Sequence, residues 1–301
     1  MYLIILGILL PVVNVNLVNI YKDSIDNTLL LLCTELLKCA FVYLVSNHVV
    51  HKCPSYTPFR WKFVVNSFCY MLTNTMAWWL MQNIDKSSFF LAAQHKILWV
   101  VTLSYIILRK TYNMKQLLGA CLVTAGAMVS QLDGLEQLNM HYMHYIVIMC
   151  VISAFSGVWI ELMMKKDRGE LKKLEKLYYY LNDSLHMYIL GLPFYFYSYW
   201  HSPNKHKLNI ELSFLICISH ALQGIVIGSM FVYYSAVWRS IQSSFTIVVL
   251  MILDSQLKLN SFAGLFLIML GSYCWSLKIQ SRQYTKLETN DNLEEIEKEN
   301  V

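Results

Sequence analysis

Two cationic side chains stand in apolar surroundings in this sequence. Lys96 lies in the stretch FFLAAQHKILWVV, and Arg239 lies in AVWRSIQSS. A cation where water is scarce needs an anionic partner. A phosphate group on a solute is one such partner, because its oxygens accept short, charge-assisted hydrogen bonds from ammonium and guanidinium groups. The pattern therefore points to a passage for solutes that carry phosphate.

Each cation also has an alternative interpretation. In the alternative interpretation, Lys96 forms an ion pair with Glu35 or Glu161, two carboxylates that lie in other apolar stretches. Arg239 stands where an apolar stretch begins, which is also a usual place for a cytosolic anchor. The residues alone leave these alternatives open.

Smaller polar groups offer further candidates. Asn74 and Thr75 stand within an apolar stretch, where they either hydrogen-bond across helices or hold a base or a sugar hydroxyl. Tyr188 offers an aromatic ring on which a base can stack. The sequence has no H-E-x-x-H, G-x-S-x-G or glycine-rich phosphate loop, so we expect neither an enzyme nor a cofactor, and no metal site.

The elements that carry these side chains are long apolar runs. The chain is 56% hydrophobic and 14% charged, which indicates an integral membrane protein. Since a bilayer core of about 30 Å needs roughly 20 apolar residues per helix, we predict an all-α membrane protein with about ten transmembrane helices. The expected spans are 1–20, 28–50, 63–81, 89–108, 116–132, 145–164, 177–200, 210–234, 241–253 and 262–277.

The polar segment 131–144 divides these spans five and five. Secondary carriers are often built from two repeats of opposite orientation with the solute site between them. We therefore predict two inverted five-helix repeats, residues 1–134 and 135–279, in which Lys96 and Arg239 occupy corresponding helices. Residues 280–301 are polar and acidic toward their end, and we expect a disordered cytosolic tail.

Charge distribution predicts the orientation. Most of the 24 Lys and Arg residues fall in the gaps on one side of the predicted spans and in the tail. Under the positive-inside rule both termini are then cytosolic. The net charge of +5 is explained by this asymmetry, and no nucleic-acid partner is expected.

Several segments, in order and at matching spacing between about residues 31 and 275, carry a family resemblance. Residues TELLK resemble an E-L-x-K signature, QHKIL a Q-L-K-I-L motif, and SAFSGVWIE an S-G-F-A-G-V-Y-F-E motif. These motifs are typical of the nucleotide-sugar transporters of solute carrier family 35, in the branch with the CMP-sialic acid and UDP-galactose carriers. The matching segments are 34–38, 70–85, 94–98, 153–161, 222–224 and 234–244.

The resemblance implies a carrier of the drug/metabolite transporter fold in the Golgi or endoplasmic reticulum membrane. Such a carrier exchanges a cytosolic nucleotide sugar, of the UDP- or CMP-sugar class, for a lumenal nucleoside monophosphate, without ATP. Membrane lipid surrounds it, and a homodimer is left open. The substrate-binding residues that the resemblance implies, by their numbers here, are Lys96, Arg239, Asn74, Ser153 and Tyr188. Gln94, in the QHKIL motif, and Thr75, beside Asn74, complete the predicted substrate site.

The chain also departs from the family pattern. Thr73, Phe89, Ala154 and Ser184 replace polar or flexible residues of the motifs, and the block before Arg239 is one residue shorter and lacks an Asp and an Asn. The sugar and base therefore stay open. Two alternatives remain: a carrier of another solute, and a membrane scaffold that has lost its transport site.

Overall fold

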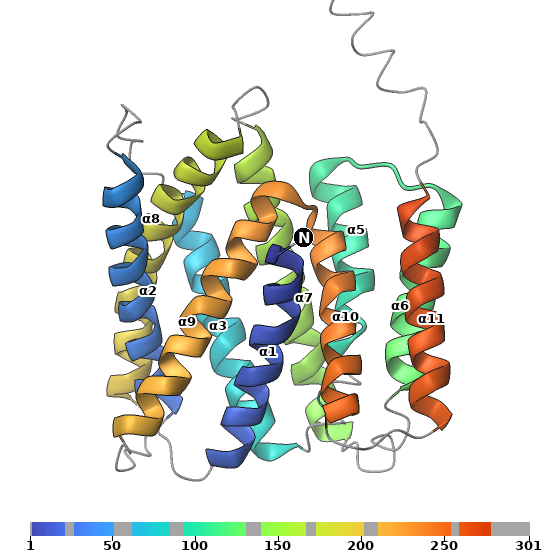
Figure 1. Cartoon of the computed structure of the whole chain (residues 1–301), viewed down its shortest axis with the longest axis horizontal. Helices are drawn as coiled ribbons and strands as arrows, with labels where there is room; N and C mark the ends of the chain where they lie inside the picture. The colour runs from blue at the N-terminus through green and yellow to red at the C-terminus, as the bar shows by residue number, and fades with distance from the viewer. Residues whose placement is uncertain are drawn as a thin grey trace, which may run out of the picture.

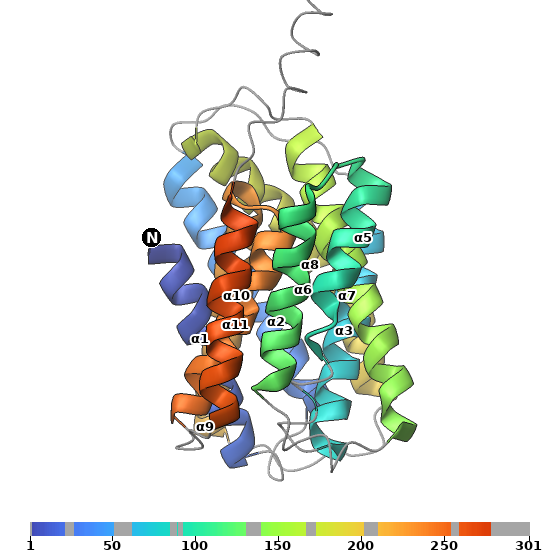
Figure 2. The same ribbon diagram turned by 90° about the vertical axis from the view of Figure 1, so that its right-hand side faces the viewer.

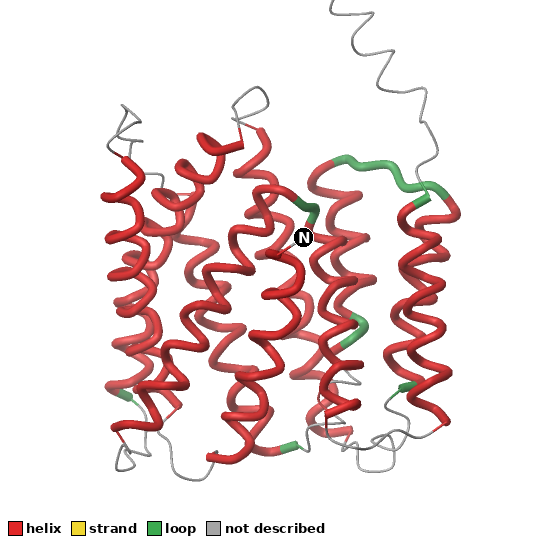
Figure 3. The backbone as a smooth tube through the Cα atoms, in the orientation of Figure 1, coloured by secondary structure: helices red, strands yellow, loops and turns green. Residues whose placement is uncertain are grey.

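The computed structural model of the chain describes residues 2–21, 27–50, 62–84, 89, 93–130, 140–166, 173–201, 210–253 and 259–277. These ranges hold ten helices and no strand (Figure 3). The helices are α1 (Tyr2–Tyr21), α2 (Asn27–Val50), α3 (Lys62–Asn83), α5 (Lys96–Leu108), α6 (Met114–Val129), α7 (Met140–Lys166), α8 (Lys173–Trp200), α9 (Ile210–Tyr233), α10 (Ala236–Leu253) and α11 (Leu259–Ser276).

The chain is an all-α membrane protein. Within the described residues, three apolar windows are long enough to span a bilayer, at Thr28–Val45, His141–Met163 and Phe214–Phe231. Large apolar side chains also cover the outside of the bundle. Phe196 and Phe266 are 55% and 66% exposed, which fits helix faces that meet lipid.

Several helices begin at residues other than those predicted from the sequence: α7 begins at Met140 and not at residue 145, and α8 at Lys173 and not at residue 177. The predicted span 89–108 is interrupted, because Gln94 and His95 form a turn and α5 starts at Lys96. The predicted span 241–253 starts too late, since α10 already begins at Ala236. Segment 131–144 is described only from residue 140, and the tail at 280–301 lies outside the described residues.

The turn before α5 lies inside the bundle. In Figure 3 it is the loop-coloured turn partway along the helices, well away from their ends. The N–H groups of Ile97 and Leu98 donate to the carbonyl oxygens of Gln94 and His95, at 3.2 and 3.1 Å. With 13 residues, α5 is about 20 Å long, shorter than the ~30 Å core of a bilayer. Lys96 therefore stands at a helix start within the thickness of the bundle.

The helices pack in a pattern that relates the two halves of the chain (Figure 1). Helix α1 packs on α9 as α7 packs on α3, helix α2 on α9 as α8 on α3, and α5 on α7 as α10 on α1. Helices α2 and α8 contact each other, as do α5 and α10, and α6 and α11. Exchanging the first five helices for the last five, in chain order, maps each of the first contacts onto its stated counterpart and each of the last three onto itself.

Helices α6 and α11 form one edge of the bundle and lie backbone against backbone (Figure 2). A Cβ atom built on Gly126 would lie 2.7 Å from the carbonyl oxygen of Gly264, and one on Gly119 would lie 2.7 Å from that of Gly271. Only glycine permits this approach. The reversed order of the two contacts shows that the helices run antiparallel.

Candidate functional site: a cavity lined by two cations

A cavity of about 160 Å³ lies among α3, α5, α7, α9 and α10. One ordered water needs only about 10–15 Å³, so the cavity has room for a solute group. Its apolar lining comes mainly from Val100, Ile160, Ile227 and Phe231. The polar or charged residues in its wall are Tyr70, Thr73, Asn74, Lys96, Ser153, Ser156, Arg239, Ser240 and Ser243.

Lys96 and Arg239 enter this cavity from different halves of the chain. Lys96 is the first residue of α5, and Arg239 lies one turn into α10. The two are close enough for their charges to repel each other. Their shared location in one cavity concentrates positive charge at a single place inside the bundle.

The carboxylates that were alternative partners of Lys96 are engaged with other cations. Glu35 pairs with Lys38 in the next turn of α2, and Glu161 pairs with Lys110 at 2.5 Å. Within the described part of the chain, neither Lys96 nor Arg239 has a carboxylate within ion-pair distance. The anchor interpretation of Arg239 does not fit either, because this residue lines the cavity and its Nε is buried without a hydrogen-bond partner among the described residues.

Helix starts add positive potential to the same place. The N-terminal end of a helix carries a partial positive charge that favours anions, and α5 begins at the cavity with Lys96. At the start of α10, backbone N–H groups already have acceptors. Ala236 N–H donates to Glu161 Oε2 at 2.8 Å, and Trp238 N–H donates to Ser235 Oγ at 3.2 Å. The N–H groups of Ile97 and Leu98 at the start of α5 also have acceptors, so the side chains of Lys96 and Arg239 are the groups that remain for an anion.

The remaining predicted site residues divide into three groups. Asn74 and Ser153 line the cavity with the two cations. Tyr188 lines a smaller neighbouring pocket of about 40 Å³, which shares Tyr70, Ile160, Ile227 and Phe231 with the cavity.

Gln94 and Thr75 line neither pocket. Gln94 is buried in the turn before α5 and accepts a hydrogen bond from Ser244 Oγ at 3.1 Å. Thr75 follows Asn74 on α3 and is turned about 100° away from it around the helix, where its hydroxyl reaches Met71 Sδ at 3.7 Å. The structure therefore places neither side chain in the wall of the cavity.

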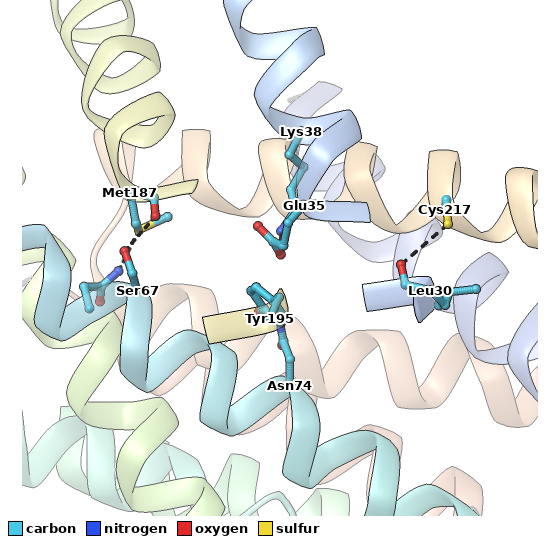
Figure 4. Close-up of polar contacts among 9 residues, drawn as sticks. Leu30, Glu35, Lys38, Ser67, Asn74, Met187, Tyr195 and Cys217 are labelled. Atoms are coloured by element: carbon cyan, nitrogen blue, oxygen red, sulfur yellow. Dashed lines mark hydrogen bonds and ion pairs between the residues drawn. The ribbon is translucent and has the colours of Figure 1, made fainter. Parts of the chain in front are cut away.

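A polar network that the sequence did not reveal adjoins the cavity (Figure 4). Asn74 Nδ2 donates to Tyr195 Oη at 3.0 Å, and Glu35 forms an ion pair with Lys38. Figure 4 shows Tyr195 between Glu35 and Asn74. Lys38, fully buried, lies 4.9 and 4.8 Å from the ring centroids of Tyr70 and Tyr188, distances suited to cation–π attraction.

The sequence held one signal of this network. Glu35 and Lys38 stand three residues apart in an apolar stretch, a spacing that puts both on one helix face. Tyr195 gave no signal, because it lies among many other aromatic residues far along the chain.

Comparisons with known proteins give a fold and no family. No family model matches the chain, and no curated protein matches it. A solved structure described only as "Crystal structure of protein" is similar, with a TM-score of 0.69, 11% identity, and coverage of 92% of this chain and 96% of that one. At this identity the likeness shows a shared fold alone.

Proposed function

We propose that this chain is a nucleotide-sugar carrier of the Golgi or endoplasmic reticulum membrane. It exchanges a cytosolic nucleotide sugar, of the UDP- or CMP-sugar class, for a lumenal nucleoside monophosphate, with both termini in the cytosol. The observation that carries the proposal is the cavity in which Lys96 and Arg239 meet without a carboxylate partner among the described residues.

The chemistry of the cavity suits a phosphorylated solute. Two cations held close together repel each other, and a phosphate between them relieves this repulsion. Charge-assisted hydrogen bonds from both side chains then hold the anion. When the solute leaves, another anion must take its place, which favours obligatory exchange over one-way flow.

The packing pattern supports alternating access. Contacts between the halves come in matched pairs, and α6 and α11 run antiparallel, as expected for two inverted five-helix repeats, residues 1–134 and 135–279. In carriers of this kind the repeats rock around a fixed central site, which opens to each side in turn. The gradients of the two solutes drive such exchange, so the proposal needs neither ATP nor an enzymatic step.

Transport by Lys96→Ala in liposomes tests the proposal. We expect uptake of labelled nucleotide sugar into vesicles preloaded with nucleoside monophosphate to fall to background, because the main phosphate contact is lost. Lys115→Ala is the matched control, since Lys115 is an exposed lysine of α6 outside the cavity, and its uptake should equal that of the unmodified protein. Near-normal uptake by Lys96→Ala would refute the role of the cavity.

Competition by UMP, CMP and GMP separates a nucleotide carrier from a carrier of another anion. A folded protein that exchanges no nucleotide of this panel would favour the scaffold alternative.

A further inference from the structure

Glu161 of α7 connects three parts of the chain. Its side chain is fully buried, and its Oε1 accepts from Lys110 Nζ at 2.5 Å. Its Oε2 accepts from the backbone N–H of Ala236, the first residue of α10, at 2.8 Å. Lys110 follows α5, so this one carboxylate joins the end of α5, which begins with Lys96, to the start of α10, which carries Arg239.

The turn after α5 holds the backbone of Lys110 in place for this contact. Arg109 has a φ of 51°, the one positive φ of a residue other than glycine in the described part of the chain. Helices often end in this left-handed conformation, which glycine usually supplies. The backbone N–H groups of Arg109 and Lys110 both donate to the carbonyl oxygen of Ser104 in α5. Backbone strain of this kind clusters in switch regions.

A second contact joins the same two helices on the far side of the cavity. Ser244 Oγ of α10 donates to Gln94 Oε1, in the turn before α5, at 3.1 Å. Along α10, Ala236 precedes the cavity residues Arg239 and Ser243, and Ser244 follows them. From Ala236 to Ser244 the helix rises about 12 Å. The cavity therefore lies between an ion pair on one side and a neutral hydrogen bond on the other.

The ion pair lies toward one end of the bundle. In Figure 3 the loops at 109–113 and 234–235, which contain Lys110 and precede Ala236, lie at the same end, whereas the turn before α5 lies partway along the helices. We propose that the ion pair of Lys110 with Glu161 is a gate that closes the cavity toward this end and breaks before the cavity opens there. The inference rests on the proposed function, in which alternating access is required and this end is the cytosolic one.

The pair suits a contact that breaks and forms again. Charge-assisted hydrogen bonds are roughly twice as strong as neutral ones, so this side is held more firmly than the side closed by Gln94 and Ser244. Lys110 and Glu161 lie in different elements, and the Lys110 side chain is 32% exposed, so it regains water when the elements separate. Glu35 and Lys38, in contrast, lie three residues apart in one helix, where movement between helices does not part them.

Labelling of a cavity cysteine from one side of the membrane tests the gate. Ser243→Cys places a thiol in the cavity wall, where Ser243 is half-buried. A membrane-impermeant maleimide is added to sealed, cargo-free vesicles that were captured through a tag on the C-terminus, and the modified fraction of the peptide with residue 243 is measured by mass spectrometry. Because α11 ends at the same end of the bundle as the loop at 109–113 (Figure 3), these vesicles present the gated end to the reagent.

We expect Lys110→Met to label Ser243→Cys about tenfold faster than the intact pair allows, the factor that loss of one charge-assisted hydrogen bond produces. The population shifts toward the state that is open at this end. Glu161→Gln should also speed labelling, since it removes the charge of the pair. Lys115→Met is the matched control, because Lys115 is an exposed lysine in the first turn of α6, and labelling should keep its original rate. Ser244→Ala weakens the contact on the far side and should not speed labelling from this end.

Unchanged labelling in Lys110→Met or in Glu161→Gln overturns the gate, as does an equal acceleration by Lys115→Met or Ser244→Ala. Because the readout needs no cargo, such a result leaves the carrier proposal intact. Failure of the carrier proposal appears separately, as near-normal uptake by Lys96→Ala.

Discussion

Lys38 and the pair formed by Lys96 and Arg239 hold positive charge inside one bundle under opposite conditions. Lys38 is fully buried, paired with Glu35 and enclosed by the rings of Tyr70 and Tyr188. Lys96 and Arg239 face a cavity and have no such carboxylate among the described residues. The difference indicates that the first cation maintains the structure, whereas the other two await a ligand.

The largest expected effect on stability comes from replacing Lys38. Lys38→Met leaves Glu35 buried without its counter-ion, and breaking a buried pair in this way costs about 3–5 kcal/mol. Thermal unfolding in detergent should show a marked fall in melting temperature. The double variant Glu35→Gln with Lys38→Met should recover most of it, because no charge is then stranded. If Lys38→Met alone is as stable as the unmodified protein, Lys38 does not maintain the structure, and its proposed difference from Lys96 and Arg239 is wrong.

An intermediate effect on stability is expected from a substitution at Glu161. Glu161→Gln keeps an oxygen for the N–H of Ala236 but loses the charge of the pair with Lys110. The Lys110 side chain is 32% exposed and remains solvated, so we expect a loss of about 1 kcal/mol. The melting temperature should lie between those of Lys38→Met and the unmodified protein. A loss as large as that of Lys38→Met would show that Lys110 depends on Glu161 as closely as Lys38 depends on Glu35.

The smallest effect on stability is expected at Lys96. Lys96→Met removes a cation that has no carboxylate partner to strand among the described residues, so the ligand-free melting temperature should stay unchanged or rise slightly. The rise in melting temperature that a bound nucleoside monophosphate produces in the unmodified protein should disappear. A drop similar to that of Lys38→Met would assign Lys96 a structural role and remove the contrast.

The sequence predicted the membrane class because run length and hydropathy follow directly from bilayer thickness. It also named Lys96, Arg239, Asn74 and Ser153, four residues that the fold brings to one cavity. Lys96, Arg239 and Asn74 stood out because charged and polar groups are rare within apolar stretches, whereas Ser153 was named by the family resemblance.

Other features depend on how the helices pack and rotate against one another. No Gly or Pro marks the break before Lys96, so hydropathy merged the segment with α5. Whether Thr75 reaches the cavity depends on the rotation of α3, which a polar residue in an apolar run does not reveal. Tyr195 pairs with Asn74 across 121 positions of sequence, a separation that no local pattern encodes.

The glycines of α6 and α11 bring main chain against main chain, with few side-chain atoms between them to repack. Two such surfaces can roll on each other but cannot part without opening a void. If the halves of the protein tilt during transport, the contact between α6 and α11 stays closed. The bundle then opens between other helices. Lipid tails then have no entry to the solute route from that flank.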